Sequence, residues 1–140
     1  MIRIELDRAN GKMGFEARDA YGHKVLLDSS PDSGGENFGV RPMQMLLMGL
    51  GGCSGIDILS ILHKQRQTVT GFHMTIDGER QAQKDPSLWQ NIHIVFELTG
   101  TIDPDKARKA CELSMDKYCS VAATLRGADC QITWDVKVNP

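Results

Sequence analysis

The sequence between positions 42 and 62 reads Pro42-Met-Gln-Met-Leu-Leu-Met-Gly-Leu-Gly-Gly-Cys53-Ser-Gly-Ile-Asp57-Ile-Leu-Ser-Ile-Leu62. As a helix this segment is apolar on every side, so protein or lipid must surround it. Gly49, Gly51, Gly52 and Gly55 each weaken a helix by about 1 kcal/mol relative to alanine. Their positions therefore indicate close packing or access beside one thiol, Cys53. The segment predicts a buried central helix that carries a reactive cysteine.

A membrane span is the first alternative for this segment, because it reaches the roughly 20 apolar residues that cross a bilayer. Gln44 and Asp57 interrupt it with polar groups, however, and an intramembrane carboxylate is costly. Patterns typical of β-strands flank it on both sides. These features favour an interior helix of a globular protein, and we expect no membrane partner.

Length and charge limit the class of protein. The chain has 140 residues, and we predict a single domain over residues 1–140. Its 18 acidic and 16 basic residues give a formal net charge of −2. A nearly neutral chain offers no basic surface for nucleic acid or for an anionic membrane. The expected partners are therefore small molecules or proteins.

The cysteines bear on the cellular compartment. The first residues, Met1-Ile-Arg-Ile-Glu-Leu-Asp7, carry a charge at every second position and so lack the apolar core of a secretory signal. We therefore expect a cytoplasmic protein, in which cysteines are usually thiols and any disulfide is transient and catalytic. The four cysteines are Cys53, Cys111, Cys119 and Cys130.

Alternation of apolar and polar residues predicts six strands. Three lie near positions 2–7, 13–18 and 23–28, and Asn10-Gly11 supplies a hairpin turn between the first two. Two more, near positions 72–77 and 92–98, predict a wider hairpin, and the last covers positions 132–138. The polar residues 29–39, rich in turn formers, predict a surface loop before the apolar helix.

The helices complete an α+β fold. The apolar helix is predicted to begin near Pro42, and Asp103-Pro104 predicts the start of a second helix that ends near Lys117. Residues 122–126 are expected to add a short turn. The predicted order is therefore β-β-β-α-β-β-α-β. Because one small sheet cannot cover a helix that is apolar all round, we expect a homodimer in which two such helices pack together through Gly51-x-x-x-Gly55.

Other catalytic motifs fit the sequence poorly. Gly49-x-Gly51 has Ser54 where a dinucleotide-binding loop requires glycine, and it follows a polar loop rather than a strand. The cysteines lack the close spacing of metal ligands, and the four histidines lie on separate predicted elements, where surface positions are expected. The histidines are His23, His63, His73 and His93.

Two of the cysteines are candidates for redox chemistry. Cys111 on a helix and Cys130 at the start of a strand fit inert core positions, whereas Cys53 and Cys119 lie beside small and hydroxylated residues at breaks in apolar packing. A nucleophilic thiolate needs nearby positive charge or hydrogen-bond donors, and a second thiol can resolve the sulfenic acid that it forms. The spacing of these two cysteines does not determine their distance, so an inert pair stays open.

Two segments resemble the OsmC/Ohr family of osmotically inducible and organic hydroperoxide resistance proteins. The first is Gly-Gly-Glu36-Asn-Phe-Gly-Val-Arg41-Pro42-Met-Gln44-Met-Leu-Leu-Met-Gly-Leu-Gly-Gly-Cys53-Ser-Gly-Ile-Asp57, and the second is Lys117-Tyr-Cys119-Ser-Val-Ala-Ala-Thr-Leu125. The similarity covers essentially the whole chain. It implies an intertwined homodimer with its active sites at the subunit interface.

By position, the resemblance assigns Cys53 as the peroxidatic cysteine and Cys119 as the resolving cysteine. It implies a thiol-dependent peroxidase of organic hydroperoxides whose Cys53–Cys119 disulfide is reduced by an external thiol, without a metal, haem, flavin or other cofactor. The family pattern also implies an activating arginine, for which Arg41 is one candidate and Arg8 and Arg18 are others.

The alternative is a dimeric OsmC-like binding or stress-response protein without peroxidase activity. In the peroxidase branches a glutamate follows the proline at the helix start and pairs with the activating arginine. This chain has Met43 at that position, followed by the uncharged Gln44. Under this alternative, Cys53 serves another thiol reaction or packing alone.

Overall fold

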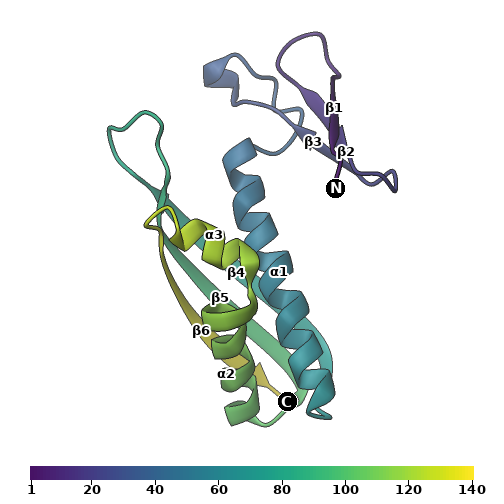
Figure 1. Cartoon of the computed structure of the whole chain (residues 1–140), viewed down its shortest axis with the longest axis vertical. Coiled ribbons are helices and arrows are strands. Elements are labelled where there is room, and N and C mark those ends of the chain that lie inside the picture. Colours follow the sequence, from purple (N-terminus) through teal and green to yellow (C-terminus); the bar gives the residue numbers. More distant parts are fainter. The chain divides into compact units, whose positions relative to one another are not determined.

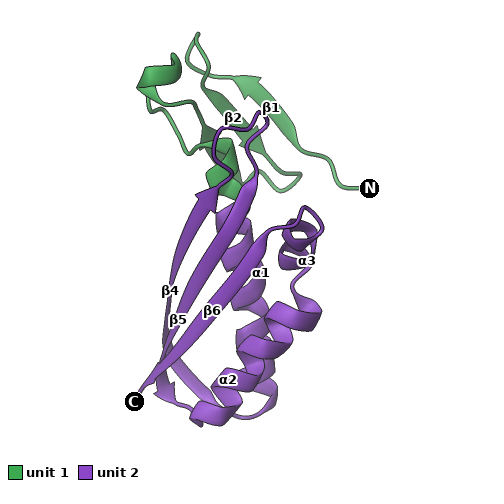
Figure 2. Cartoon of the chain, turned by 90° about the vertical axis from the view of Figure 1, so that its left-hand side faces the viewer, with its two compact units in different colours: residues 1–46 green, residues 47–140 purple.

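A computed structural model describes residues 1–140, which form two compact units, residues 1–46 and residues 47–140 (Figure 2). In the first unit, three short strands form an antiparallel sheet in the order β1-β2-β3. The predicted opening meander is therefore confirmed, and Gly11 has a φ of 74° in the turn between β1 and β2. The strands are β1 (Glu5–Arg8), β2 (Phe15–Arg18) and β3 (Lys24–Leu27).

The loop that leads to the apolar helix is organised by one buried carboxylate. Asp28 accepts hydrogen bonds from the backbone N–H groups of Ser29, Glu36 and Phe38. These bonds, chiefly that of Glu36, hold the pKa of the Asp28 carboxyl below its ordinary value. The polar segment predicted as a loop thus has a defined path, which includes the short 3₁₀ turn η1 (Pro31–Ser33).

The second unit is a three-stranded sheet with its helices on one face (Figures 1 and 2). Strand β5 lies in the middle, with β4 antiparallel and β6 parallel to it. The parallel pairing arises because the chain crosses the sheet face through two helices between β5 and β6. The elements of this unit are α1 (Pro42–Lys64, which begins in the first unit), β4 (Thr68–Arg80), β5 (Trp89–Thr101), α2 (Pro104–Leu113), α3 (Ser120–Arg126) and β6 (Gln131–Asn139).

The predicted α+β class is confirmed, but the predicted order lacks one helix. A single helix was expected between the last two strands, whereas the structure has α2, a π-helical turn η2 (Ser114–Tyr118) and the separate helix α3. The break lies at Cys119, whose backbone is extended, with φ −72° and ψ 104°. Its sulfur accepts a hydrogen bond from the N–H of Ala122 and so caps the new helix.

The core of the second unit lies between α1 and the inner face of the sheet. Gly51 and Gly55 of α1 face β4, where an added Cβ would lie 2.8 Å from Ile76 Cδ1 and 3.0 Å from Met74 Cε. The expectation that these two glycines lie at a helix–helix contact is therefore wrong, since their missing side chains let α1 approach the sheet. The largest fully buried side chains here include Leu50, Ile58, Leu62, Ile92, Ile94, Phe96 and Leu98.

The opposite side of α1 is apolar and uncovered in the single chain. Gly49 and Gly52 have open space beside them, and Ile56 is 71% exposed. By length and composition alone, α1 could also cross a membrane. In the structure, 33% of its most apolar 18-residue stretch is buried. Its packing on β4 is that of a core helix whose remaining face lacks a cover. Other exposed apolar side chains on α1 are Leu46, Met48 and Leu59.

Replacing Gly100 by alanine is expected to destabilise the protein by about 2 kcal/mol, because backbone strain of this kind costs that order of free energy. Gly100 has a φ of 141°, and an added Cβ would lie 2.1 Å from the carbonyl oxygen of Thr68. The matched control is Gly71→Ala in the paired strand, where the nearest atom, Thr99 Cβ, is 3.4 Å away. Urea unfolding measures both variants, and equal stabilities would contradict this account of Gly100.

Candidate functional site

The fold brings Cys53 and Cys119 together. Cys53 lies in the middle of α1, and Cys119 is the residue that precedes α3. Both are free thiols, and their sulfurs lie within 4.8 Å of each other and of a carboxylate oxygen of Asp57. The pair that sequence patterns single out is thus a single site in the second unit, and a third side chain belongs to it.

Local backbone structure positions Cys119. The N–H of Cys119 donates to the carbonyl of Ser114 at 2.8 Å, which closes the π-helical turn η2. Arg126, at the end of α3, donates a hydrogen bond to the carbonyl of Met115. The turn and α3 are therefore tied together on both sides of Cys119, and the first N–H groups of α3 point toward the two sulfurs.

The pKa of Cys53 is lower than that of an ordinary cysteine. Partial burial raises it, but hydrogen bonds from the backbone of Val121, from Cys119 and from Ser120 more than offset that effect. The hydroxyl of Ser120 lies 3.8 Å from the Cys53 sulfur. Hydrogen bonds to the thiolate stabilise the charged form, so Cys53 is the thiol of the pair that ionises more readily.

The pKa of Cys119 moves the other way. Burial is the main cause and raises it to about 11, and the neighbouring Cys53 adds to the rise. The N–H of Ala122, 3.4 Å from the Cys119 sulfur, opposes this shift only in part. The site therefore pairs a thiol that ionises more readily than an ordinary cysteine with one that stays protonated at neutral pH.

Alkylation with iodoacetamide is expected to separate the two thiols by pH. Only the thiolate reacts, so the rate rises as the pH passes the pKa. Cys53 should be half-ionised at a lower pH than an ordinary cysteine, whereas Cys119 should require a pH near 11. Mass spectrometry of digests after brief labelling at each pH measures both curves. A Cys53 midpoint at or above that of free cysteine would contradict the assigned roles.

Sequence patterns did not identify Asp57 as part of this site. It follows Cys53 by four residues on α1, a spacing that places both side chains on the same helix face. The buried hydroxyl of Ser114 donates to Asp57 Oδ2 at 3.0 Å and so fixes the carboxylate. The sequence feature that could have identified Asp57 is a charged residue one helical turn after the thiol in an otherwise apolar segment. Ser114 gave no signal, because the π-helical turn that places it depends on tertiary structure.

A groove of about 490 Å³ opens beside Asp57. It runs between the C-terminal half of α1 and the end of α2 together with the π-helical turn. Its walls combine apolar surface with the ammonium group of Lys64, so it could hold an apolar molecule near the thiols. The lining residues are Asp57, Ser60, Ile61, Lys64, Gln65, Leu113 and Tyr118.

The three candidate arginines are engaged within the first unit. Arg41 donates to the carbonyl of Gly39 and to Asn37 Oδ1, both at 3.0 Å. Arg18 pairs with Asp7, and Arg8 donates to backbone carbonyls of its own hairpin turn. Within the second unit, the groups that lower the pKa of Cys53 are hydrogen-bond donors. A role for Arg41 in activation or binding stays a prediction.

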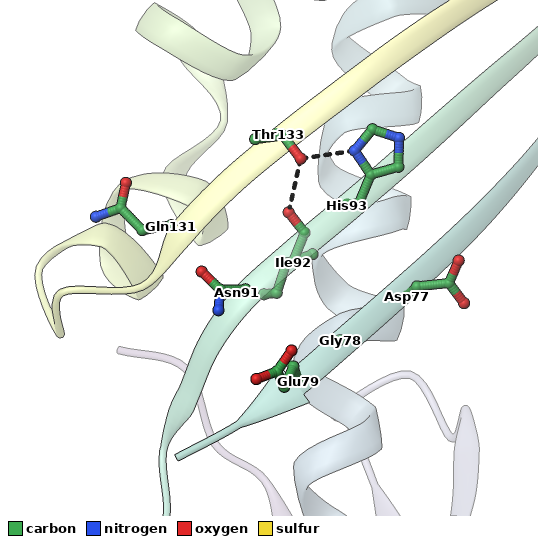
Figure 3. Close-up of a pocket in the computed structure, with 8 residues that line it drawn as sticks. All are labelled: Asp77, Gly78, Glu79, Asn91, Ile92, His93, Gln131 and Thr133. Carbon is green, nitrogen blue, oxygen red and sulfur yellow. Dashed lines mark hydrogen bonds between the residues drawn. The ribbon is translucent and has the colours of Figure 1, made fainter. Parts of the chain in front are cut away.

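A second hollow lies on the outer face of the β4-β5-β6 sheet (Figure 3). His93 is held there by Thr133 Oγ1 at 2.6 Å and by Asp135 Oδ2 at 3.1 Å. This bonded histidine is only partly exposed, whereas the other three are exposed as predicted. The hollow contains no cysteine. Its lining residues are Asp77, Gly78, Glu79, Asn91, Ile92, His93, Gln131 and Thr133.

The remaining cysteines lie outside the site, in the core. Cys111 is fully buried on α2, and burial raises its pKa to about 12. Cys130 is buried before β6, and its pKa is also raised by burial. Neither thiol is poised to ionise at neutral pH, in agreement with the core positions predicted for them.

The chain is similar in sequence and in fold to known proteins. The family model described as OsmC-like protein matches residues 33–135. Protein YhfA of Escherichia coli K12 is 39% identical over 115 residues, which are 81% of this chain and 82% of that protein. The crystal structure of a hypothetical protein from Aquifex aeolicus has a TM-score of 0.82 at 30% identity, covering 100% of this chain and 98% of that one. An organic hydroperoxide resistance protein OsmC from Legionella pneumophila, also described as a predicted redox protein, shares the fold with a TM-score of 0.66 at 15% identity, covering 100% and 97%.

Proposed function

Because this chain belongs to the OsmC-like protein family, we propose that it is a thiol-dependent peroxidase that reduces organic hydroperoxides through Cys53 and Cys119. The observation that carries the proposal is the pairing of two thiols whose sulfurs lie within 4.8 Å of each other, with pKa values shifted in opposite directions. The name of the Legionella protein of the same fold supports the class of substrate. Sulfur does the chemistry, so the proposed reaction needs no cofactor.

In the first step the Cys53 thiolate attacks the terminal oxygen of the hydroperoxide. The O–O bond breaks, the sulfur is oxidised by two electrons to a sulfenic acid, and the alkoxide takes up a proton and leaves as an alcohol. Donors from Ser120 and Val121 hold the thiolate in place. Cys119 then attacks the Cys53 sulfur, the S–O bond breaks, water leaves, and a disulfide forms.

The short sulfur–sulfur separation supports the second step. The two sulfur atoms lie within 4.8 Å, and a disulfide requires a bond of about 2.05 Å. Side-chain rotation and a small adjustment of the π-helical turn can close this gap. An external thiol reductant then attacks the disulfide and returns both cysteines to the reduced form, which completes the cycle with the hydroperoxide as the only other substrate.

The groove beside Asp57 is the proposed approach for the substrate. Ile61, Leu113 and Tyr118 offer apolar surface on which the organic part of a hydroperoxide can rest. The peroxide group would then lie toward Asp57, the lining residue whose carboxylate is within 4.8 Å of both sulfurs. Larger apolar hydroperoxides should therefore be better substrates than hydrogen peroxide.

We further propose that the active form is an intertwined homodimer with its sites at the subunit interface. Two uncovered surfaces support this. One is the apolar side of α1 around Gly52 and Ile56. The other is the β1-β2-β3 sheet, none of whose residues is fully buried in the single chain. A second copy that covers both would complete one domain from residues 1–140, and Arg41 is the proposed contact to substrate in that assembly.

The cytoplasm is the proposed location, because the cycle needs a supply of reducing thiols and both cysteines start as thiols. The proposed partners are a second copy of the chain, a small hydroperoxide and the thiol reductant. Neither nucleic acid nor a membrane has a place in this cycle.

Peroxide turnover tests the proposal directly. The reduced protein is mixed with cumene hydroperoxide, and peroxide loss is followed together with the number of free thiols. One equivalent of peroxide should be consumed per chain, with loss of two thiols and formation of an intramolecular Cys53–Cys119 disulfide. Addition of a dithiol reductant should then permit repeated turnover. Absence of peroxide consumption with every thiol reductant tried would reject the activity.

The alternative is an OsmC-like binding protein without peroxidase activity, and two observations favour it. Met43 replaces the glutamate that the peroxidase pattern places after the proline. The carboxylate of Asp57 lies within 4.8 Å of both sulfurs, and the two-step peroxidase cycle gives it no chemical role. Under this alternative, a stable dimer would bind apolar molecules in the groove while both thiols survive exposure to the hydroperoxide.

A further inference from the structure

We propose that Cys53, Asp57 and Cys119 form a binding site for a thiophilic divalent cation, for which Zn²⁺ is the best match. The site exists in the reduced protein and does not depend on peroxidase activity. Two thiolates and one carboxylate are ligands that Zn²⁺ accepts, and three protein ligands with an open fourth position are typical of catalytic zinc sites. Soft sulfur ligands disfavour Mg²⁺ and Ca²⁺.

The geometry of the three ligand atoms fits one ion. The two sulfurs and a carboxylate oxygen all lie within 4.8 Å of one another. In tetrahedral zinc sites, bond lengths near 2.3 Å to sulfur and 2.0 Å to oxygen separate the ligand atoms by roughly 3.5 to 3.8 Å. A contraction of about 1.3 Å or less, within reach of side-chain rotation, would therefore bring the three atoms into the coordination sphere of one ion.

The helical framework supplies this convergence without a sequence motif. Cys53 and Asp57 lie four positions apart, on one face of the long helix α1. Cys119 comes from the break between η2 and α3, more than sixty positions later in the printed sequence. The ligands are thus set on a helix and a capped turn, whose backbone is fixed before any ion arrives.

Each ligand atom already has a hydrogen-bond partner of the kind that supports metal ligands. Ser114 donates to the Asp57 carboxylate at 3.0 Å. The N–H of Ala122 lies 3.4 Å from the sulfur of Cys119, and the Ser120 hydroxyl lies 3.8 Å from that of Cys53. Such outer partners orient ligands and stabilise thiolates, and their loss typically lowers metal affinity by about 10- to 100-fold. All three ligand side chains are therefore oriented by hydrogen bonds before an ion binds.

The negative charge of the three ligands is a further reason to expect a bound cation. Once ionised, the three ligands carry three negative charges in a small volume, whereas the groups bonded to them are neutral donors. A bound divalent cation offsets most of that charge. Binding would displace the proton of Cys119 and any proton on Cys53 into solvent. Oxidation to a disulfide would remove both sulfur ligands and release the ion.

Cobalt is the spectroscopic probe for this site. Titration of the reduced, metal-free protein with Co²⁺ should saturate at one ion per chain. A sulfur-to-cobalt charge-transfer band in the near ultraviolet should accompany binding, and Zn²⁺ should displace the cobalt and abolish the band. The wild-type spectrum alone tests the ligands, since the band requires thiolate coordination whether or not any variant folds.

Variants then assign the ligands. Cys53→Ser and Cys119→Ser should each lose the band or most of its intensity, and Asp57→Asn should weaken cobalt binding by at least about 10-fold while keeping the acceptor for Ser114. Ser114→Ala should weaken binding by about 10- to 100-fold. The control is Cys111→Ala with Cys130→Ala, which removes the two core thiols outside the site and should leave binding unchanged.

Two results would overturn the metal site: the absence of a sulfur-to-cobalt band at saturating Co²⁺, or a band that persists in both Cys53→Ser and Cys119→Ser. Peroxide consumption by the metal-free protein is measured in parallel. Cobalt binding without peroxide consumption would leave the metal site standing and reject the peroxidase, whereas peroxide consumption without the band would do the reverse.

Discussion

Replacing Cys53 by serine is expected to reduce peroxide consumption to the background rate of hydroperoxide and reductant alone. The thiolate is the nucleophile, and a serine hydroxyl in the same place stays protonated at neutral pH. The backbone N–H groups of Ser120 and Val121 that lower the pKa of Cys53 would then face a neutral oxygen. Steady-state peroxide loss with a dithiol reductant, compared between wild type and variant, measures the effect.

Cys119→Ser should separate the two steps of the same reaction. The first equivalent of peroxide should still be consumed, because Cys53 keeps its backbone donors. The product should then be a sulfenic acid on Cys53, detectable by trapping with dimedone and mass spectrometry, rather than a disulfide. Cys111→Ala is the matched control, since this thiol is buried on α2 outside the site. It should keep both peroxide turnover and disulfide formation.

The results for Cys53→Ser and Cys119→Ser distinguish the proposed peroxidase from the alternative, a binding protein without peroxidase activity. Wild-type turnover that survives in Cys53→Ser would remove Cys53 from the chemistry. A folded wild type without turnover would favour the binding protein instead. Loss in Cys53→Ser, together with a trapped sulfenic acid in Cys119→Ser, would fit only the proposed two-step cycle. Circular dichroism of each variant excludes loss of fold as the cause.

Local patterns were sufficient to predict the strands. In β4 and β5, alternate residues such as Met74, Ile76 and Ile94 face the helices while His73 and Thr75 face outward. This period of two depends only on neighbours in the chain and on one buried face. The sequence does not reveal that β6 pairs parallel to β5, because pairing is decided by how the helices between them cross the sheet.

The helix α3 and the role of the glycines depended on contacts that no local pattern contains. The sequence predicted that the preceding helix ends near Lys117 and that residues 122–126 form a short turn, whereas the sulfur of Cys119 caps a helix that runs to Arg126. Gly51 and Gly55 suggested contact between two helices, yet Ile76 and Met74 of β4 occupy the space beside them. The error about the glycines arises because small residues indicate a close approach but not the partner that approaches.

The candidate site was predictable in its thiols but not in its full composition. Small and hydroxylated neighbours and the family resemblance pointed to Cys53 and Cys119. Asp57 was noted only as a charge that disfavours membrane insertion, although its spacing of four residues from Cys53 places it on the same face. Its hydrogen bond from Ser114 joins α1 to a π-helical turn, and such a turn forms only when tertiary packing favours it.

Replacing Ile56 by aspartate is expected to convert the proposed dimer into monomers. In the single chain this side chain is 71% exposed, and substitutions at such sites usually change the free energy of unfolding by no more than about 0.5 kcal/mol. If a second copy covers this side of α1, the variant instead loses apolar contact and buries an unpaired carboxylate. The combined cost is about 3 kcal/mol or more, which raises the dimer dissociation constant by roughly 100-fold or more.

Sedimentation velocity over a range of protein concentrations measures this effect, and Thr75→Asp is its matched control. Thr75 is exposed on the outer face of β4, on the side away from the helices, so the same charge there should leave the dimer intact. Because the active sites are proposed to lie at the subunit interface, Ile56→Asp should also lose peroxide turnover while the circular dichroism spectrum of its helices and strands is retained. A monomeric wild type, or a dimer indifferent to aspartate at position 56, would mean that the uncovered side of α1 is not the contact between subunits, and the exposed apolar residues beside Gly49 and Gly52 would then require a different partner.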